Sequence, residues 1–495
     1  MLEKTTVVLI VLIFYKLLLI SIGLWANRRN NNISDFLIGN RQLGPVVASI
    51  SYAASCSSAW TLLGVSGIAF TIGLSAVWFV VGSIAGMILS WMYVAPKLMS
   101  LSHQNRLTTL TDILLLNVRS SFWRMWIVGF ASLAIIICFG FYVAAQLQGA
   151  GQTFNETFSV DQQSSIIIGA IIILIYTLLG GFWAVSVTDT IQGILMLGAA
   201  LLLPLVAYMH MGGWESFWTS YSAIVSPEQL DWFQKKTGLI ALGFVVSIVS
   251  ISLGAFGQPH LLVRFMALRD KKALNQAKYI SVFWFTVVFT GMFFLGLAGR
   301  VIVGELSNAE SVFIVLSDQL FVPIVSAIII AALLSAIMST ADSQLLAGSA
   351  AISHDLGLAH RFKGKELLIS RLAIVFILAI STTIALYLPA SIFSRALLAW
   401  SSLGAAFGPI IIARVLDMKP ADSAVFLAIA AGFCTSIWFH FYPNSLSALI
   451  STEAVSGVVY ERVGSFFLGA AILIISHLRN NDQTEVFEKA SNYKA

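Results

Sequence analysis

The sequence predicts an all-α membrane protein with about thirteen transmembrane helices, two of which are broken near their middle. Three observations support this fold class. The 495 residues are 58% hydrophobic and only 10% charged, whereas soluble proteins carry roughly 25% charged residues. Apolar segments of about 20 residues, the length needed to cross a bilayer, recur along the whole chain. Two of these segments contain clusters of residues that interrupt helices.

The apolar segments are separated by connections too short to hold a soluble domain, so residues 1–495 are predicted to form one transmembrane domain. The two longest connections, near 96–125 and 210–237, hold about thirty residues each. The thirteen segments lie near residues 7–26, 44–70, 74–95, 126–148, 165–182, 191–209, 238–257, 279–303, 322–348, 368–389, 394–413, 422–440 and 458–477.

Lysine and arginine residues predict the orientation, because they are retained on the cytoplasmic side of a membrane. Alternate connections are basic: the first contains Arg28, Arg29 and Arg41, and a later one begins with Arg264. The intervening segments "GQTFNETFSVDQQSS" and "SNAESVFIVLSDQ" contain neither lysine nor arginine. We therefore expect a multi-pass protein of the cell inner membrane, with its N-terminus outside and its C-terminus in the cytoplasm.

Two segments are predicted to be broken. "SYAASCSSAW" (51–60) carries four serines, and "SISLGAFGQPH" (250–260) carries Gly254, Gly257 and Pro259. Unwound backbone costs several kcal/mol per unpaired group in lipid, so it persists only where it faces a cavity. The breaks lie five segments apart and hence in opposite orientations, which indicates an inverted repeat. Alternatively, these small residues allow close helix packing. The repeats would cover about 42–210 and 238–415, with peripheral helices at 7–26, 422–440 and 458–477.

The ninth segment carries a polar helix face that suits a cation. Hydroxyl and carbonyl oxygens are suitable ligands for a hard cation such as Na⁺, and the carbonyls of Ala54 and Ser57 at the first break could complete the shell. The alternative is that the hydroxyls bond to their own helix. Four residues at helical spacing form this face: Ala336, Ser339, Thr340 and Ser343.

Asp342 lies within the same apolar segment, where a carboxylate costs at least a few kcal/mol and usually has a partner or a task. Asp189 precedes the sixth segment on the same predicted inner side. The two carboxylates could bind a cation together with Ser343, or one of them could stay protonated. Alternatively, Asp342 contacts inner-side water or a basic residue and Asp189 caps its helix. Lys16 in the first segment is expected to snorkel or to form a pair.

Five motifs occur in order along the chain: "FLIGNRQLGP", "GGFWAVSVTDTIQG", "FGQPHLLVRFMA", "SAIMSTADSQLL" and "LGAAFGP". Together they resemble the sodium/solute symporter family, and within it the sodium/proline symporters. This resemblance implies a LeuT-type fold of five plus five helices and the Na⁺-coupled import of a small organic solute. It also implies that the main sodium ligands are the Ala54, Ser57 and Ala336 carbonyls with the Ser339 and Thr340 hydroxyls.

The resemblance places the substrate pocket at Ser58, Trp60, Tyr142, Ile251 and Ala255, and a second cation site at Asp189, Asp342 and Ser343. The chain departs from the proline symporters in three ways. Cys56 stands where they have an aspartate, Ile251 and Ala255 stand where they have aromatic residues, and Asp342 adds a carboxylate that they lack. A wider, less aromatic pocket is therefore expected.

The predicted function is a Na⁺-coupled symporter that imports a small solute, most simply an amino acid such as proline. The alternatives are a nutrient sensor on a transporter scaffold and a symporter of pantothenate or another organic acid. The sequence contains no phosphate loop, nucleophile elbow or paired metal ligands, so we expect neither an enzyme nor a cofactor. The expected partners are Na⁺, the solute and the lipid bilayer, without nucleic acid. The sequence does not indicate the oligomeric state.

Overall fold

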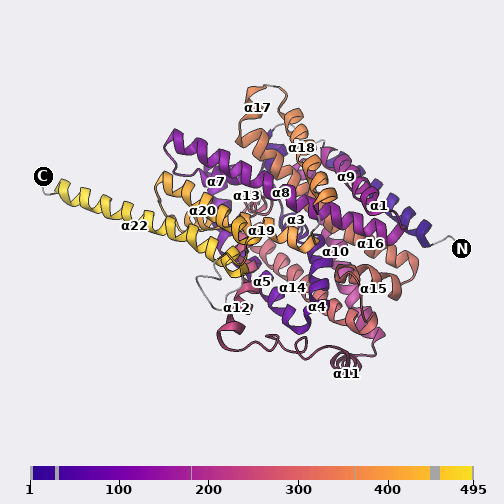
Figure 1. The fold of residues 1–495 in the computed structure, drawn as a ribbon. Coiled ribbons are helices and arrows are strands. Elements are labelled where there is room, and N and C mark those ends of the chain that lie inside the picture. Colours follow the sequence, from indigo (N-terminus) through magenta and orange to yellow (C-terminus); the bar gives the residue numbers. More distant parts are fainter. Residues whose placement is uncertain are drawn as a thin grey trace.

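The computed structural model describes residues 4–27, 33–179, 181–362, 364–388, 390–445 and 457–492, and the regular structure in these ranges is helical apart from one isolated bridge between Leu43 and Leu268 (Figure 1). The long helices are α1 (Lys4–Asn27), α8 (Ser121–Phe158), α9 (Gln162–Leu179), α10 (Phe182–His210), α12 (Gly238–Val249), α14 (Lys271–Ile302), α16 (Pro323–Ala350), α18 (Glu366–Tyr387), α19 (Ile392–Val415), α20 (Asp422–Phe441) and α22 (Ser465–Asn492).

Shorter helices form the breaks and the connections. They are α2 (Ile33–Ile38), η1 (Gly39–Arg41), α3 (Pro45–Cys56), η2 (Trp60–Val65), α4 (Ser66–Ile72), η3 (Gly73–Ala76), α5 (Val77–Leu89), η4 (Ser90–Val94), α6 (Ala95–Asn105), α7 (Leu110–Leu114), α11 (Trp214–Ile224), η5 (Ser250–Gly257), α13 (Pro259–Met266), η6 (Ala309–Ser311), α15 (Val312–Leu320), η7 (Ala351–Asp355), α17 (Leu358–Arg361), α21 (Gly457–Val459) and η8 (Tyr460–Gly464).

Eleven helical stretches within the described ranges are long and apolar enough to cross a bilayer. The outward faces carry large exposed apolar side chains such as Phe14, Trp126 and Phe283, which indicates contact with lipid. Eleven of the thirteen predicted segments correspond to these stretches. The second and fifth fall instead on the shorter apolar helices Pro45–Cys56 and Gln162–Ile175. The second is short because it is broken, and the count of thirteen crossings stays a prediction.

Both predicted breaks are present. At the first break, helix α3 ends at Cys56 and Ser57 is extended, with φ −90° and ψ 90°. The chain becomes helical again at Trp60. At the second break the narrow helix η5 ends at Gly257, Gln258 is extended, and Pro259 starts α13. Proline at a helix start costs no hydrogen bond, because the first N–H groups of a helix lack internal partners.

The two breaks lie in the centre of the bundle. Helix α3 packs against α10, α14 and α16, whereas η5 packs against α5 and α19, and α13 also contacts α3. Close approach at the second break requires glycine: a Cβ on Gly257 would lie 2.8 Å from the Cα of Gly404 in α19. Each break thus contacts helices from the other predicted half. The division into repeats at 42–210 and 238–415 remains a prediction.

Some of the basic residues that predict the orientation lie within the described ranges. Arg28 and Arg29 lie outside the described ranges. Arg264, which the sequence pattern assigned to a basic cytoplasmic connection, is instead a buried residue of α13, with 1% of its side chain exposed. The second broken helix continues as α13 beyond Pro259, so the basic connection starts several residues after Arg264. The orientation of the protein stays a prediction.

Candidate functional site

The polar face of α16 lies against the first break. The Ser339 hydroxyl donates to the Ala54 carbonyl at 3.1 Å and to the Ala336 carbonyl at 3.3 Å. The Thr340 hydroxyl donates to the Ser55 carbonyl at 3.1 Å. These residues are completely buried. Three of the five predicted sodium ligands, the oxygens of Ala54, Ala336 and Ser339, therefore meet at one point, and Thr340 contacts the neighbouring carbonyl.

Ser57 sits where α3 ends. Its backbone N–H still bonds the Ala53 carbonyl at 2.9 Å, but its extended conformation ends the helical ladder there. The Ser57 hydroxyl is buried and has no hydrogen-bond partner within the described ranges. An unwound segment with free oxygens fits a hard cation that prefers oxygen ligands. The Ser55 carbonyl is an additional oxygen that the sequence reasoning did not include.

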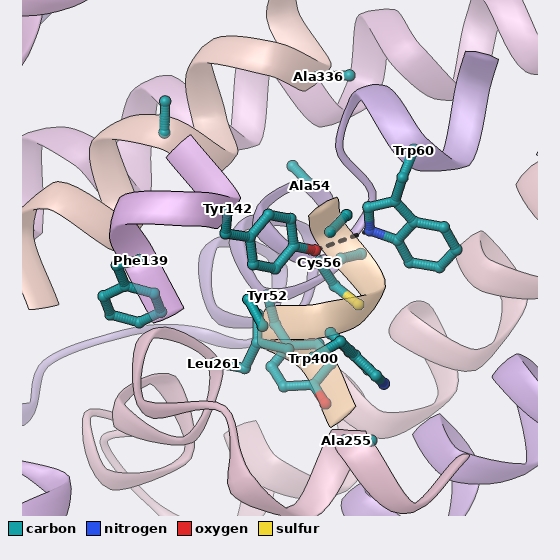
Figure 2. Close-up of a cluster of buried hydrophobic side chains, with 14 of the residues drawn as sticks. Tyr52, Ala54, Cys56, Trp60, Phe139, Tyr142, Ala255, Leu261, Ala336 and Trp400 are labelled. Carbon is teal, nitrogen blue, oxygen red and sulfur yellow. Dashed lines mark hydrogen bonds between the residues drawn. The ribbon is translucent and has the colours of Figure 1, made fainter. Parts of the chain in front are cut away.

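The predicted pocket residues of the first repeat contact each other across the break (Figure 2). The Trp60 indole N–H donates to the Tyr142 hydroxyl at 2.8 Å. The Ser58 hydroxyl accepts from the Trp60 backbone N–H at 3.3 Å, so it begins the second half of the broken helix. Cys56, at the position where the proline symporters have an aspartate, is fully buried beside this pair.

On the other side of the pocket, Ile251 and Ala255 are also buried. The aromatic wall there comes from Trp400 of α19, which the sequence reasoning missed. Its indole N–H donates to the Ile251 carbonyl at 2.8 Å, and its ring lies 6.1 Å from that of Trp60. Figure 2 shows Trp400 between Ala255 and Cys56. The predicted pocket would therefore be less depleted in aromatic residues than positions 251 and 255 alone suggest.

Two glutamines, also missed, hold the broken backbone. The Gln146 side-chain carbonyl accepts from the Ala59 N–H at 3.1 Å, at the start of the second half of the first broken helix. The Gln258 amide donates to the Gly254 carbonyl at 3.0 Å and to the Trp400 carbonyl at 3.1 Å. Both glutamines are fully buried. Backbone groups that lose their helical partners are costly unless a side chain replaces those partners.

A buried ion pair lies one turn from the predicted sodium ligands. Arg264 donates to the Asp189 carboxylate at 2.8 Å, with both side chains at 1% exposure or less. Ser51 and Ser55 each bridge the pair. Each hydroxyl accepts from Arg264, at 2.8 and 2.7 Å, and donates to Asp189, at 2.8 and 3.0 Å. Two of the four serines in "SYAASCSSAW" thus stabilise this pair.

Of the three residues predicted to form the second cation site, Asp189 and Ser343 contact Arg264, whereas Asp342 contacts Ser343. Ser343 joins the ion pair, because its hydroxyl accepts from Arg264 at 2.6 Å and lies 2.9 Å from the Ser55 hydroxyl. Asp342 is completely buried, and its Oδ1 accepts from Ser343 at 3.4 Å. Its Oδ2 has no hydrogen-bond partner in the described ranges. The guanidinium of Arg264 therefore occupies the space beside Asp189 and Ser343.

A cavity of about 40 Å³ borders Arg264 of the ion pair. Its lining includes Phe182, Pro259, Arg264, Ser343 and Asp355. The Thr109 hydroxyl donates to Asp355 at 2.8 Å. A cavity of this size that has Arg264, Ser343 and Asp355 in its lining can hold water.

Glu310, in the connection between α14 and α15, gives a first testable prediction. Burial raises its pKa above the ordinary value of 4.5, although the Phe393 and Ile392 N–H groups oppose this shift. The folded state therefore binds this proton more tightly than the unfolded state, and the stability it contributes falls as pH rises through the raised pKa. We expect Glu310→Gln to weaken the decline of melting temperature from pH 4.5 upward. Glu305→Gln, at a side chain that is 93% exposed, is the control, and identical pH profiles for Glu310→Gln and the parent would contradict the prediction.

Comparison with known proteins points to a family. The sequence model described as the sodium:solute symporter family matches residues 36–432. The chain is 30% identical over 494 residues to the high-affinity proline transporter PutP of Bacillus subtilis, covering 96% of this chain and 98% of that protein. It is 32% identical over 478 residues to the osmoregulated proline transporter OpuE of the same organism, covering 94% of each.

Two solved structures share the fold. A Na⁺-coupled sialic acid symporter superposes with a TM-score of 0.74 at 17% identity, over 95% of this chain and 96% of that one. Mhp1, a nucleobase-cation-symport-1 family transporter, superposes with a TM-score of 0.54 at 12% identity, over 90% and 95%. These similarities support the predicted all-helical transporter fold with broken helices.

Proposed function

The chain belongs to the sodium:solute symporter family, and we propose that it imports a small amino acid such as proline together with Na⁺. As a member of this family it is a multi-pass membrane protein and a Na⁺-coupled solute symporter, not an enzyme. The finer proposal concerns the substrate and the residues that bind it. Relatives described as proline transporters support an amino acid.

The observation that carries the proposal is the contact between α16 and the first break. Ser339 and Thr340 direct their hydroxyls at the Ala54 and Ser55 carbonyls. A Na⁺ ion between these oxygens would join α16 to the broken helix in place of the direct hydrogen bonds. Because the same broken helix supplies Ser58 and Trp60, binding of the ion would also fix one wall of the substrate pocket. This shared element couples the two cargoes, since each ligand then stabilises the conformation that the other binds.

The solute would lie between the two breaks, next to Trp60, Tyr142 and Trp400. These side chains are buried, with at most 3% exposed, so solute entry requires the helices to separate, as in alternating access between repeats. The two breaks expose helix ends near the pocket, and the partial charges of such ends suit the carboxylate and ammonium of an amino acid. Arg264, which pairs with Asp189, lines the small cavity beside this site.

The test is uptake into proteoliposomes that contain the purified full-length chain. An imposed inward Na⁺ gradient is expected to drive accumulation of one or more amino acids from a panel of radiolabelled solutes that includes proline and pantothenate. A choline gradient of the same size should drive none. Accumulation of pantothenate with no amino acid transported would overturn the proposed substrate class.

Pocket width gives a further prediction. Ala255 is fully buried next to Trp400, so a large side chain there would occupy solute volume. We expect Ala255→Tyr to shift preference among the transported solutes toward smaller ones, by about tenfold in relative uptake, which corresponds to 1.4 kcal/mol. Leu242→Tyr, on the lipid-exposed face of α12, is the matched control. An unchanged order of preference in a folded Ala255→Tyr protein would contradict the pocket assignment.

A further inference from the structure

Lys16 is a charged residue inside an apolar helix. The stretch Thr5–Ile22 of α1 is apolar enough to cross the bilayer and contains no other charged residue. Such a residue usually faces the protein interior and has a partner. Helix α1 contacts α16 here: the hydroxyls of Tyr15 and Ser335 form a hydrogen bond, and the Lys16 ammonium contacts the Met338 sulfur. A thioether carries no charge, so this contact leaves the ammonium unbalanced.

Within the described part of the chain, Asp342 is a buried acid that lacks a counter-charge, as Lys16 is a base that lacks one. It is completely buried, and its Oδ2 has no hydrogen-bond partner in the described ranges. Asp189 is balanced by Arg264, but no such ion pair involves Asp342 in those ranges. Asp342 follows Met338 by four residues, which places it on the same face of α16 about 6 Å further along. The four-carbon lysine side chain can span this distance.

The surroundings favour this partner over others. Helix α1 packs against both α10, which carries Asp189, and α16, which carries Asp342 (Figure 1). A cavity of about 280 Å³ beside Lys16 gives its side chain room to move. Apart from Lys16, the residues lining that cavity are all apolar, so the cavity itself offers the ammonium no acceptor.

We propose that Lys16 is the counter-charge of Asp342 and takes the place that a second sodium ion would fill. Two buried acids, Asp189 and Asp342, are then balanced by two buried bases, Arg264 and Lys16. The protein consequently carries one Na⁺ per cycle, at Ser339 and Thr340, and the peripheral helix α1 sets this stoichiometry. The inference rests on the proposed sodium-coupled function, and it concerns this chain's own Lys16 and not the family's shared ligands.

The test counts sodium ions by equilibrium binding of ²²Na⁺ alone to the purified full-length protein. The parent is expected to bind one ion per chain. Lys16→Met removes the ammonium and exposes the Asp342 charge, so it should bind two. Lys16→Met combined with Asp342→Asn should return to one, and Lys16→Arg should stay at one. Tyr15→Phe, which breaks the neighbouring contact with α16 and keeps the charge, is the control for a merely structural role of α1 and should also stay at one.

Melting temperatures give a second readout. Removing one member of a buried pair destabilises a protein strongly, whereas replacing both members is often neutral. Lys16→Met should therefore melt several degrees below the parent in choline, and recover in Na⁺, because a bound ion stabilises the folded state. The double variant should melt near the parent in both salts. Recovery of the melting temperature in the double variant would show energetic coupling between Lys16 and Asp342, which a packing defect at Lys16 would not produce.

The number of bound ions distinguishes failure of this inference from failure of the proposed function. If the parent and Lys16→Met each bind one Na⁺ ion per chain, the inference is wrong and the proposed function is unaffected. Two ions on the parent also overturn the inference. Absence of Na⁺ binding to the parent overturns the proposed function, and with it this inference. If neither Lys16→Met nor the double variant folds, Lys16 stabilises the protein through a group other than Asp342, and the proposal is wrong.

Discussion

Replacing Arg264 with leucine is expected to abolish Na⁺-driven uptake. The substitution leaves Asp189 charged and buried, with only the Ser51 and Ser55 hydroxyls as donors. Breaking a buried pair by removing one partner costs about 3–5 kcal/mol, which is more than about a hundredfold in an equilibrium constant. Because α3, α10, α13 and α16 all supply a member of this cluster, the loss also separates the helices that carry the predicted sodium ligands.

The experiment compares uptake and melting temperature in Arg264→Leu, Arg264→Lys and the parent. Arg264→Lys should restore stability in part but not the full network, since one ammonium cannot reproduce the fork of guanidinium donors to Ser51, Ser55 and Asp189. Arg269→Leu is the matched control, because Arg269 is half-exposed and its side chain forms an ion pair with its neighbour Asp270. Parental uptake and melting temperature in Arg264→Leu would show that this pair contributes neither to the fold nor to transport.

The sequence predicted the breaks because their causes are local. Serines compete with the backbone for hydrogen bonds at the first break, and glycines and a proline weaken the helix at the second. The chain indeed unwinds at Ser57 and Gln258. The face formed by Ser339 and Thr340 was also predictable, since helical spacing alone brings these hydroxyls to one side. Which carbonyls they would meet depended on how α16 docks on α3, and the resemblance to the sodium/solute symporters supplied that information.

The ion pair was not predicted, because its members are 75 positions apart in sequence. Arg264 follows the second break by only a few residues and was therefore attributed to the basic connection that follows. Its signal was present in "FGQPHLLVRFMA": the residues on both sides of the arginine are apolar, which is unusual for a cytoplasmic loop. Asp189 likewise appeared to precede its helix, but α10 begins at Phe182 and places it inside.

Trp400, Gln146 and Gln258 were missed for a related reason. Each forms a hydrogen bond with the backbone of a segment that is distant in sequence: Trp400 with Ile251, Gln146 with Ala59 and Gln258 with Trp400. Glutamines and tryptophans are frequent in helices without such roles, so residue type and spacing do not mark them. Their importance follows only from the broken backbone that they satisfy, which a three-dimensional arrangement reveals.

The sodium assignment itself yields the last prediction. Thr340→Ala and Ser339→Ala each remove a hydroxyl oxygen that faces a carbonyl of the first break. A hydrogen bond or ligand to a charged group contributes about 1.5–3 kcal/mol, so each change should raise the Na⁺ concentration for half-maximal uptake by about tenfold or more. Ser349→Ala is the matched control, because Ser349 lies on the same helix, is equally buried, and its hydroxyl donates to the Leu346 carbonyl of its own helix. The measurement is initial uptake against Na⁺ concentration at fixed ionic strength. An unchanged sodium dependence in both Thr340→Ala and Ser339→Ala would place the coupling ion elsewhere, whereas a rise in all three variants, including the control, would indicate a general loosening of α16.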